Sequence, residues 1–119
     1  MNEIGLFDVN FDTGKCYWSL ELKRMLGVRR DVSAQFHLLL QCIHPDDRRA
    51  FGRNAMQPFR FDCPKDSSIE FRVVHDDGRV RWLHMERRAI VRNSGPKDVI
   101  RIVGFALEVG APAGLSRAA

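Results

Sequence analysis

Two short runs of mainly apolar residues at the start of the chain predict a β-hairpin. Residues 4–9 and 15–18 are brief runs of this kind. Asp12-Thr13-Gly14 lies between them, and a glycine there supplies the positive φ that a tight turn requires. We therefore expect two paired strands before the first helix.

The following segment changes to the three- and four-residue spacing of apolar positions that is typical of helices. Residues 20–26 lie between Ser19, a favourable N-cap, and Gly27, a favourable C-cap. A second helix is predicted over residues 34–43, with Ser33 as its cap. Both helices are short, and each carries one apolar face.

A third helix is predicted to begin at Pro45 and to run to about Met56. Proline suits the first position of a helix because its φ is already helical. Asp46 and Asp47 follow it, where the positive end of the helix dipole favours acidic side chains. No catalytic role is needed to explain this pair of carboxylates.

The second half of the chain has the pattern of three long strands. Residues 69–75, 80–91 and 99–109 are rich in β-forming residues, and turn signals separate them at 76–78 and 93–96. With the hairpin they predict an α+β fold: a five-stranded antiparallel sheet with short helices packed on one face.

Both faces of this sheet are partly apolar, although a sheet with one wet face should alternate cleanly. The candidate dimer face is Trp82, Leu83, Met85 and Phe105, with the outward parity left open. A flanking helix or a second copy would cover such a face. Few residues precede the first strand, so a homodimer is the favoured cover.

Composition is that of an ordinary globular domain, with 45% hydrophobic and 29% charged residues among 119. We expect one domain over 1–110 and the start of a linker over 111–119. No apolar run is long enough to span a membrane. Three cysteines in no disulfide or metal spacing favour reduced thiols and a cytoplasmic location.

The net charge of +4 raises the possibility of nucleic acid as a partner. The basic residues come in scattered pairs beside acids, however, and this favours a mixed solvated surface over a binding stripe. Specific nucleic-acid binding is therefore the least favoured of the functions considered.

The order strand, strand, helices, three strands resembles the PAS fold, and the motifs resemble its PAS_3 (sensory box) subfamily. The similar segments, over about residues 4–110, are Ile43-His44-Pro45-Asp46-Asp47-Arg48, then Glu70-Phe71-Arg72-Val73, then Asp77-Gly78 with Arg81-Trp82. Glu108-Val109-Gly110 departs from the closing Asp-Ile-Thr of that family. This departure leaves the coupling to a following domain open.

The resemblance implies a sensory module that controls an output domain, such as a histidine kinase or a diguanylate cyclase, and is not itself an enzyme. A small ligand would bind between the helices and the sheet. The candidate pocket residues are Phe36, Leu39, Leu40, Phe71 and Val73. A ligand-free dimerisation module is the alternative.

No cofactor is predicted. Gly52-Arg53-Asn54 resembles part of the flavin-photoreceptor motif of this fold, but residue 55 is alanine where those proteins carry the reactive cysteine. We interpret the segment as ordinary helix. Haem would need a ligand such as His37, and no histidine pair has a metal-binding spacing. His44, Pro45, Asp46, Asp47 and Arg48 are assigned a structural role.

Overall fold

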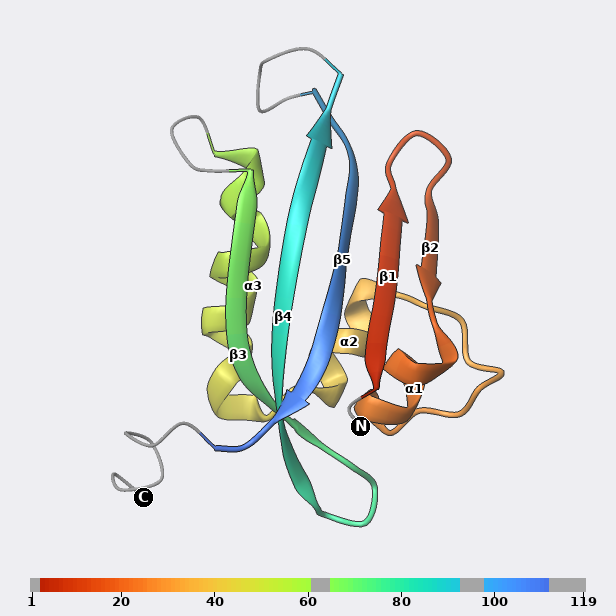
Figure 1. Ribbon diagram of the computed structural model, residues 1–119, viewed down its shortest axis with the longest axis vertical. Helices are drawn as coiled ribbons and strands as arrows, with labels where there is room; N and C mark the ends of the chain where they lie inside the picture. The colour runs from red at the N-terminus through yellow and green to blue at the C-terminus, as the bar shows by residue number, and fades with distance from the viewer. Residues whose placement is uncertain (1–2, 61–64, 93–97, 112–119) are drawn as a thin grey trace.

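One antiparallel sheet organises the chain. The computed structural model describes residues 3–60, 65–92 and 98–111, and within them five strands pair in the order β2-β1-β5-β4-β3 (Figure 1). The strands are β1 Ile4–Asn10, β2 Lys15–Trp18, β3 Asp66–Val74, β4 Val80–Val91 and β5 Val99–Val109. This arrangement confirms the predicted α+β fold.

Short helices fill the connection between β2 and β3. They are α1 Leu20–Leu26, α2 Phe36–Cys42, the 3₁₀ turn η1 Pro45–Asp47, α3 Arg48–Met56 and the 3₁₀ turn η2 Gln57–Phe59. Figure 1 shows α3 behind β3, on the same side of the sheet as α2. We call the side of the sheet that packs on these helices the inner face and the opposite side the outer face.

The caps of α1 are those that the sequence predicts. Ser19 Oγ accepts hydrogen bonds from the backbone N–H of Leu22 at 3.2 Å and of Leu6 at 2.9 Å. The second bond ties the start of α1 to β1. Gly27 ends the helix in the left-handed region, with φ 76°, where glycine carries no steric penalty.

Two predicted boundaries are wrong. Helix α2 begins at Phe36, not at residue 34, because the backbone of Gln35 is still extended (φ −150°, ψ 142°) and Ser33 lies too early to cap it. Strand β3 begins at Asp66, because its polar first residues pair with β4 through their backbone despite lacking an apolar pattern. The predicted turn at 93–96 and most of the predicted linker lie outside the described residues.

The alternation along β4 decides which side chains enter the core. Leu83 and Met85 are 0% and 2% exposed on the inner face, whereas Trp82 lies on the outer face, opposite Val109. Leu83 and Met85 therefore cannot belong to a dimer face, which corrects the sequence-based assignment. Trp82 and Phe105 share the outer parity.

Gly104 of β5 sits where strand and core leave no room for a side chain. A Cβ there would overlap the carbonyl oxygen of Glu86 and lie 2.7 Å from Cζ of Phe7. We expect Gly104→Ala to lower the free energy of unfolding by about 1–3 kcal/mol. Denaturant titration measures the change.

Gly52→Ala is the matched control. A Cβ on Gly52 meets nothing within 4 Å, and the residue lies inside α3. Removing a helical glycine should stabilise the protein by about 0.5–1 kcal/mol. Equal effects of the two substitutions would contradict the proposed packing of β5 against β4 and Phe7.

Candidate ligand cavity

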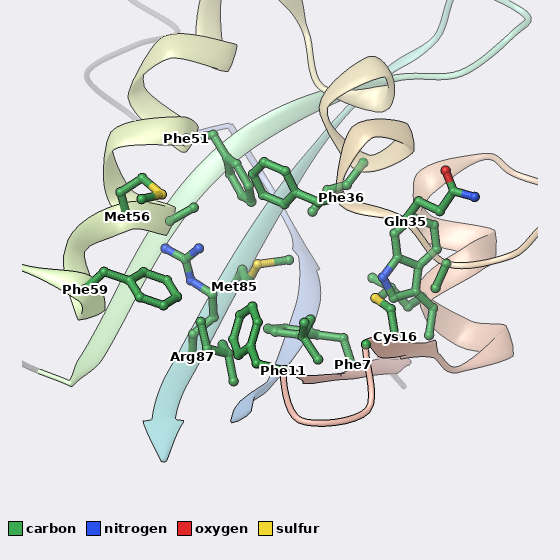
Figure 2. A pocket seen from close by; sticks show the side chains of 18 residues that line it. Phe7, Phe11, Cys16, Gln35, Phe36, Phe51, Met56, Phe59, Met85 and Arg87 are labelled. Atoms are coloured by element: carbon green, nitrogen blue, oxygen red, sulfur yellow. The ribbon is translucent and has the colours of Figure 1, made fainter. Parts of the chain in front are cut away.

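A cavity of about 590 Å³ lies between the helices and the inner face of the sheet (Figure 2). This volume is in the range of sites that hold small organic molecules. Every strand except β3, all three α-helices and η2 contribute to its wall. The lining residues are Phe7, Val9, Phe11, Gly14, Cys16, Trp18, Leu22, Ala34, Gln35, Phe36, Leu39, Phe51, Ala55, Met56, Phe59, Met85, Arg87 and Ile102.

Aromatic rings hold the walls apart. Phe36 and Phe51 face each other with centroids 6.4 Å apart, and Phe11 meets Phe59 edge-on at 5.6 Å. Ala55 of α3 lines the same cavity, and its methyl side chain fills little of it. Phe11, Phe36 and Met56 line the cavity and are yet about half exposed, so they mark its opening to solvent.

Polar side chains are few in this wall. Cys16 of β2 presents a thiol whose pKa is raised, first by burial and then by the charge of Asp8, so the thiol stays protonated at neutral pH. Gln35 brings an amide. Arg87 of β4 brings a guanidinium, which Figure 2 shows directed into the space near Phe51 and Phe59.

Arg87 is the one buried cation of the described wall. The residue is 8% exposed, and its Nε and Nη2 are buried without a hydrogen-bond partner among the described residues. Its Cζ lies 5.4 Å from the centre of the Phe51 ring. Burial lowers the pKa of Arg87 to about 10, so the group still carries its charge at neutral pH.

The structure places two of the five predicted pocket residues, Phe36 and Leu39, in the cavity wall. Phe71 and Val73 are 0% exposed in the core instead, because Phe71 packs edge-on against Phe51 at 4.9 Å. Leu40 packs against the core without lining the cavity.

Sequence reasoning did not identify Phe51 and Arg87 as cavity residues. A signal for Arg87 was present in the alternation of β4, where it shares one face with Met85 and Ala89, the face that the structure places in the core. A charged residue at a core position is the informative exception to such a pattern.

The segment from His44 to Arg48 joins α2, α3 and β3. His44 Nδ1 accepts a hydrogen bond from the backbone N–H of Asp46, and the Arg48 side chain donates to the carbonyls of Ile43 and Gln41 at the end of α2. These contacts suit the structural role that we assigned to the segment.

Asp47 has a partner that was not predicted from its place at the start of the third helix. Its carboxylate accepts three hydrogen bonds from Arg72 of β3, one from the backbone N–H and two from the guanidinium, at 2.7–2.9 Å. The side-chain hydrogen bond from Arg72 is the main reason that the pKa of Asp47 lies below its ordinary value. This pair ties the start of α3 to the sheet.

The outer face carries a second apolar surface. Cross-strand neighbours pair Ile4 with Leu107, Leu6 with Phe105 and Trp82 with Val109. Ile4 and Leu6 are 54% and 51% exposed. We call these six residues the outer-face patch: Ile4, Leu6, Trp82, Phe105, Leu107 and Val109.

Comparison with known proteins places this geometry in a family. The family model described as PAS fold, PAS_3, matches residues 15–106. The chain belongs to the PAS fold family. No helix in the described ranges is long and apolar enough to cross a membrane.

The curated relatives of this PAS domain are kinases much longer than the chain. A blue-light-activated histidine kinase of Brucella ovis is 30% identical over 87 residues, which cover 73% of this chain and 17% of that kinase. The match therefore spans about one sixth of the relative's length.

Solved structures share the fold. A sensory box histidine kinase/response regulator from Burkholderia thailandensis is 26% identical, with a TM-score of 0.72 over 97% of this chain and 83% of that one. The N-terminal domain of a diguanylate cyclase with PAS/PAC sensor from Marinobacter aquaeolei is 18% identical, with a TM-score of 0.70 over 89% and 94%.

A light-sensing relative raises the question of whether the cavity suits a flavin. Gly52-Arg53-Asn54 lies within α3, where Arg53 is exposed and the Asn54 side chain donates to the Ser68 carbonyl. Ala55 lines the cavity and offers no nucleophile. The one thiol of the described wall, Cys16, lies on β2 and not in this segment, so Gly52-Arg53-Asn54-Ala55 does not fit the thiol-adduct photochemistry of the motif that it resembles.

The described cavity wall offers haem no histidine as an axial ligand. None of the four histidines, all within the described residues, lines the cavity. His37 lies on the exposed side of α2, with its Nε2 3.2 Å from the Gln41 amide.

The Asp47–Arg72 pair should make the free energy of unfolding depend on pH in the acidic range. Because the folded protein holds the pKa of Asp47 below its unfolded value, the pair contributes fully above about pH 4 and is lost as pH falls through the folded value. Asp47→Asn should cost about 1–3 kcal/mol at pH 7 and should flatten this part of the pH profile.

Asp46→Asn provides the control for this experiment. The Asp46 side chain is 76% exposed and its carboxylate lies 3.9 Å from His44 Nδ1. Denaturant titrations between pH 3 and pH 7, roughly spanning the carboxyl range, measure both variants. A profile of Asp47→Asn that matches wild type would show that the pair does not hold α3 to the sheet.

Proposed function

We propose that this chain is the sensory input module of a larger signalling protein and that its cavity binds a small organic ligand. The cavity between α2, α3 and the inner face is the observation that carries the proposal. Histidine kinases and a diguanylate cyclase among the relatives support an output domain of this kind in the same polypeptide. The module itself has no catalytic role.

A ligand in this cavity would act by shifting populations between two arrangements of the module. It would touch α2 and α3 on one side and β1, β4 and β5 on the other, so it would stabilise one spacing of helices and sheet over another. A complete switch needs about 5.5 kcal/mol of differential affinity, and a partial one needs less.

The module is proposed to work without haem or flavin. Ala55, and a wall that no histidine reaches, support this proposal. The purified protein should absorb only in the protein band. A flavin or Soret band that co-purifies in stoichiometric amount would overturn the proposal.

The outer-face patch is proposed to pair with a second copy of itself. An isologous contact suits a patch that crosses neighbouring strands of one sheet. Charged residues beside it have partners within the chain, as in Asp8–Arg101 at 3.1 Å and His84–Glu86 at 3.0 Å, and this pairing limits repulsion between two copies. Dimerisation without a ligand is the alternative function that this surface favours.

A cytoplasmic location and only generic affinity for nucleic acid complete the proposal. Cys16 and Cys42 are free thiols, as expected in a reducing compartment. Five arginines of the sheet are paired with acids, which leaves fewer cations for phosphates; they are Arg72, Arg81, Arg88, Arg92 and Arg101, of which Arg92 directly follows β4. Cell fractionation and a filter-binding assay with duplex DNA test the two statements.

Filling the cavity should abolish ligand binding. The apolar probe 1-decanol, at about ten times its Kd, should stabilise the wild type by about 1.4 kcal/mol in thermal denaturation. Ala55→Phe should lose this stabilisation, because the new ring occupies the cavity. Ala50→Phe, on the exposed side of the same helix, should retain it.

Stabilisation that persists in Ala55→Phe would place the probe elsewhere and would contradict the proposed site. Circular dichroism confirms that both variants are folded. No stabilisation of the wild type would refute the ligand-binding function itself.

A charge on the outer-face patch should separate the dimer. Leu6→Glu should give a folded monomer, because covering each large apolar side chain is worth about 1.5–3 kcal/mol and a buried unpaired carboxylate opposes association. Leu20→Glu is the matched control, since Leu20 is 42% exposed on α1, outside the sheet. If sedimentation shows that the wild type is a monomer at high micromolar concentration, the proposed dimer is wrong.

A further inference from the structure

Arg87 differs from other arginines of the same sheet. Arg72, Arg81 and Arg88 each lie within 3.0 Å of an acidic oxygen, and each has a clear structural partner. Arg87 is buried, points into the cavity, and has no acidic side chain beside it in the described wall. Its Nε and Nη2 are the donors that find no partner among the described residues.

A charged guanidinium in such surroundings is costly unless something compensates it. Removing a cation from water carries a large desolvation penalty, and good hydrogen bonds must offset it. The Phe51 ring, 5.4 Å from Cζ, offsets only a part of it. The Phe51 ring also leaves the N–H donors in the plane of the guanidinium unsatisfied. A carboxylate accepts hydrogen bonds from donors of this kind.

We propose that the cavity binds an amphipathic organic anion, one carboxylate on an apolar body, and that Arg87 is the residue that holds the carboxylate. This inference rests on the proposed ligand-binding function and names the class of ligand. Two carboxylate oxygens match the planar fork of a guanidinium and would satisfy Nε and Nη2 together.

The remaining wall defines the body of this ligand. Phe7, Trp18, Phe36 and Leu39 are apolar, and so is Ala55, whose small side chain fills little of the cavity. Aliphatic chains and fused aromatic rings both suit such a wall, whereas a sugar or a polyanion would leave polar groups unpaired. The binding energy of the body comes from the wall, and the preference for an anion comes from Arg87.

Decanoate and 1-decanol test the proposal because they share one apolar chain and differ in the head group. Calorimetric titration should show that wild type binds decanoate at least about tenfold more tightly than 1-decanol, as a charge-assisted hydrogen bond allows. Arg87→Met should bind 1-decanol as before and should lose this preference. Arg88→Met, which removes the neighbouring exposed arginine, should keep it.

Folding of the variant is not an obstacle, because replacing a buried unpaired charge by an apolar side chain of similar length is neutral or stabilising. Arg87→Lys adds a further readout: it keeps a charge but not the fork, so its preference should fall between those of wild type and Arg87→Met.

Equal affinity of wild type for decanoate and 1-decanol would overturn the role of Arg87 and leave a ligand-binding cavity. So would a preference for decanoate that survives in Arg87→Met. Failure of both probes to bind would instead refute the proposed function, and this inference with it.

Discussion

Hydrogen bonds attach the helices to the sheet near its two edges and not at its middle strands. The cavity exists because the middle of the sheet has no such attachment. Helix α1 is tied to β1 through Ser19. The start of α3 is tied to β3 through Asp47 and Arg72, and Ile43 bridges to Val73 beside them. Between these anchors, helices of seven and nine residues are too short to cover the inner face of a five-stranded sheet.

Side chains decide what occupies the space that the short helices leave. Phe36 of α2 and Phe51 of α3 line the cavity with rings, whereas Ala55 of α3 contributes only a methyl group. Arg87 is the buried strand residue that lines the same cavity. Its cation makes the site selective, because Nε and Nη2, which have no partner among the described residues, favour ligands that carry an acceptor with a negative charge.

Most helices and strands of the fold could be predicted from local patterns in the sequence. Ser19, Gly27 and the turn at Gly78 correctly marked the ends of elements, because capping and positive φ are properties of single residues. The polar start of β3 was not predictable, because its conformation comes from pairing with β4 and not from its own pattern. No local signal in the sequence marked the extended backbone of Gln35 before α2.

The residues of the candidate site were harder to predict from the sequence than the fold was, and the reason is physical. Which apolar side chains fill the core and which line a cavity depends on how two walls meet, so Phe36 and Phe71 looked equivalent in the sequence although only the first faces the cavity. The parity of β4 was also undetermined until Leu83 was found buried and Trp82 was found on the outer face. The charge at residue 87 was the one visible clue.

The location of a bound ligand tests the account most directly. Methyl NMR spectra of the protein with decanoate distinguish the inner from the outer face, because Leu39, Met85 and Ile102 line the cavity while Leu6 and Leu107 lie on the outer-face patch. We expect shift changes and ligand contacts at the first group alone. Contacts at Leu6 and Leu107, with the first group unchanged, would contradict it.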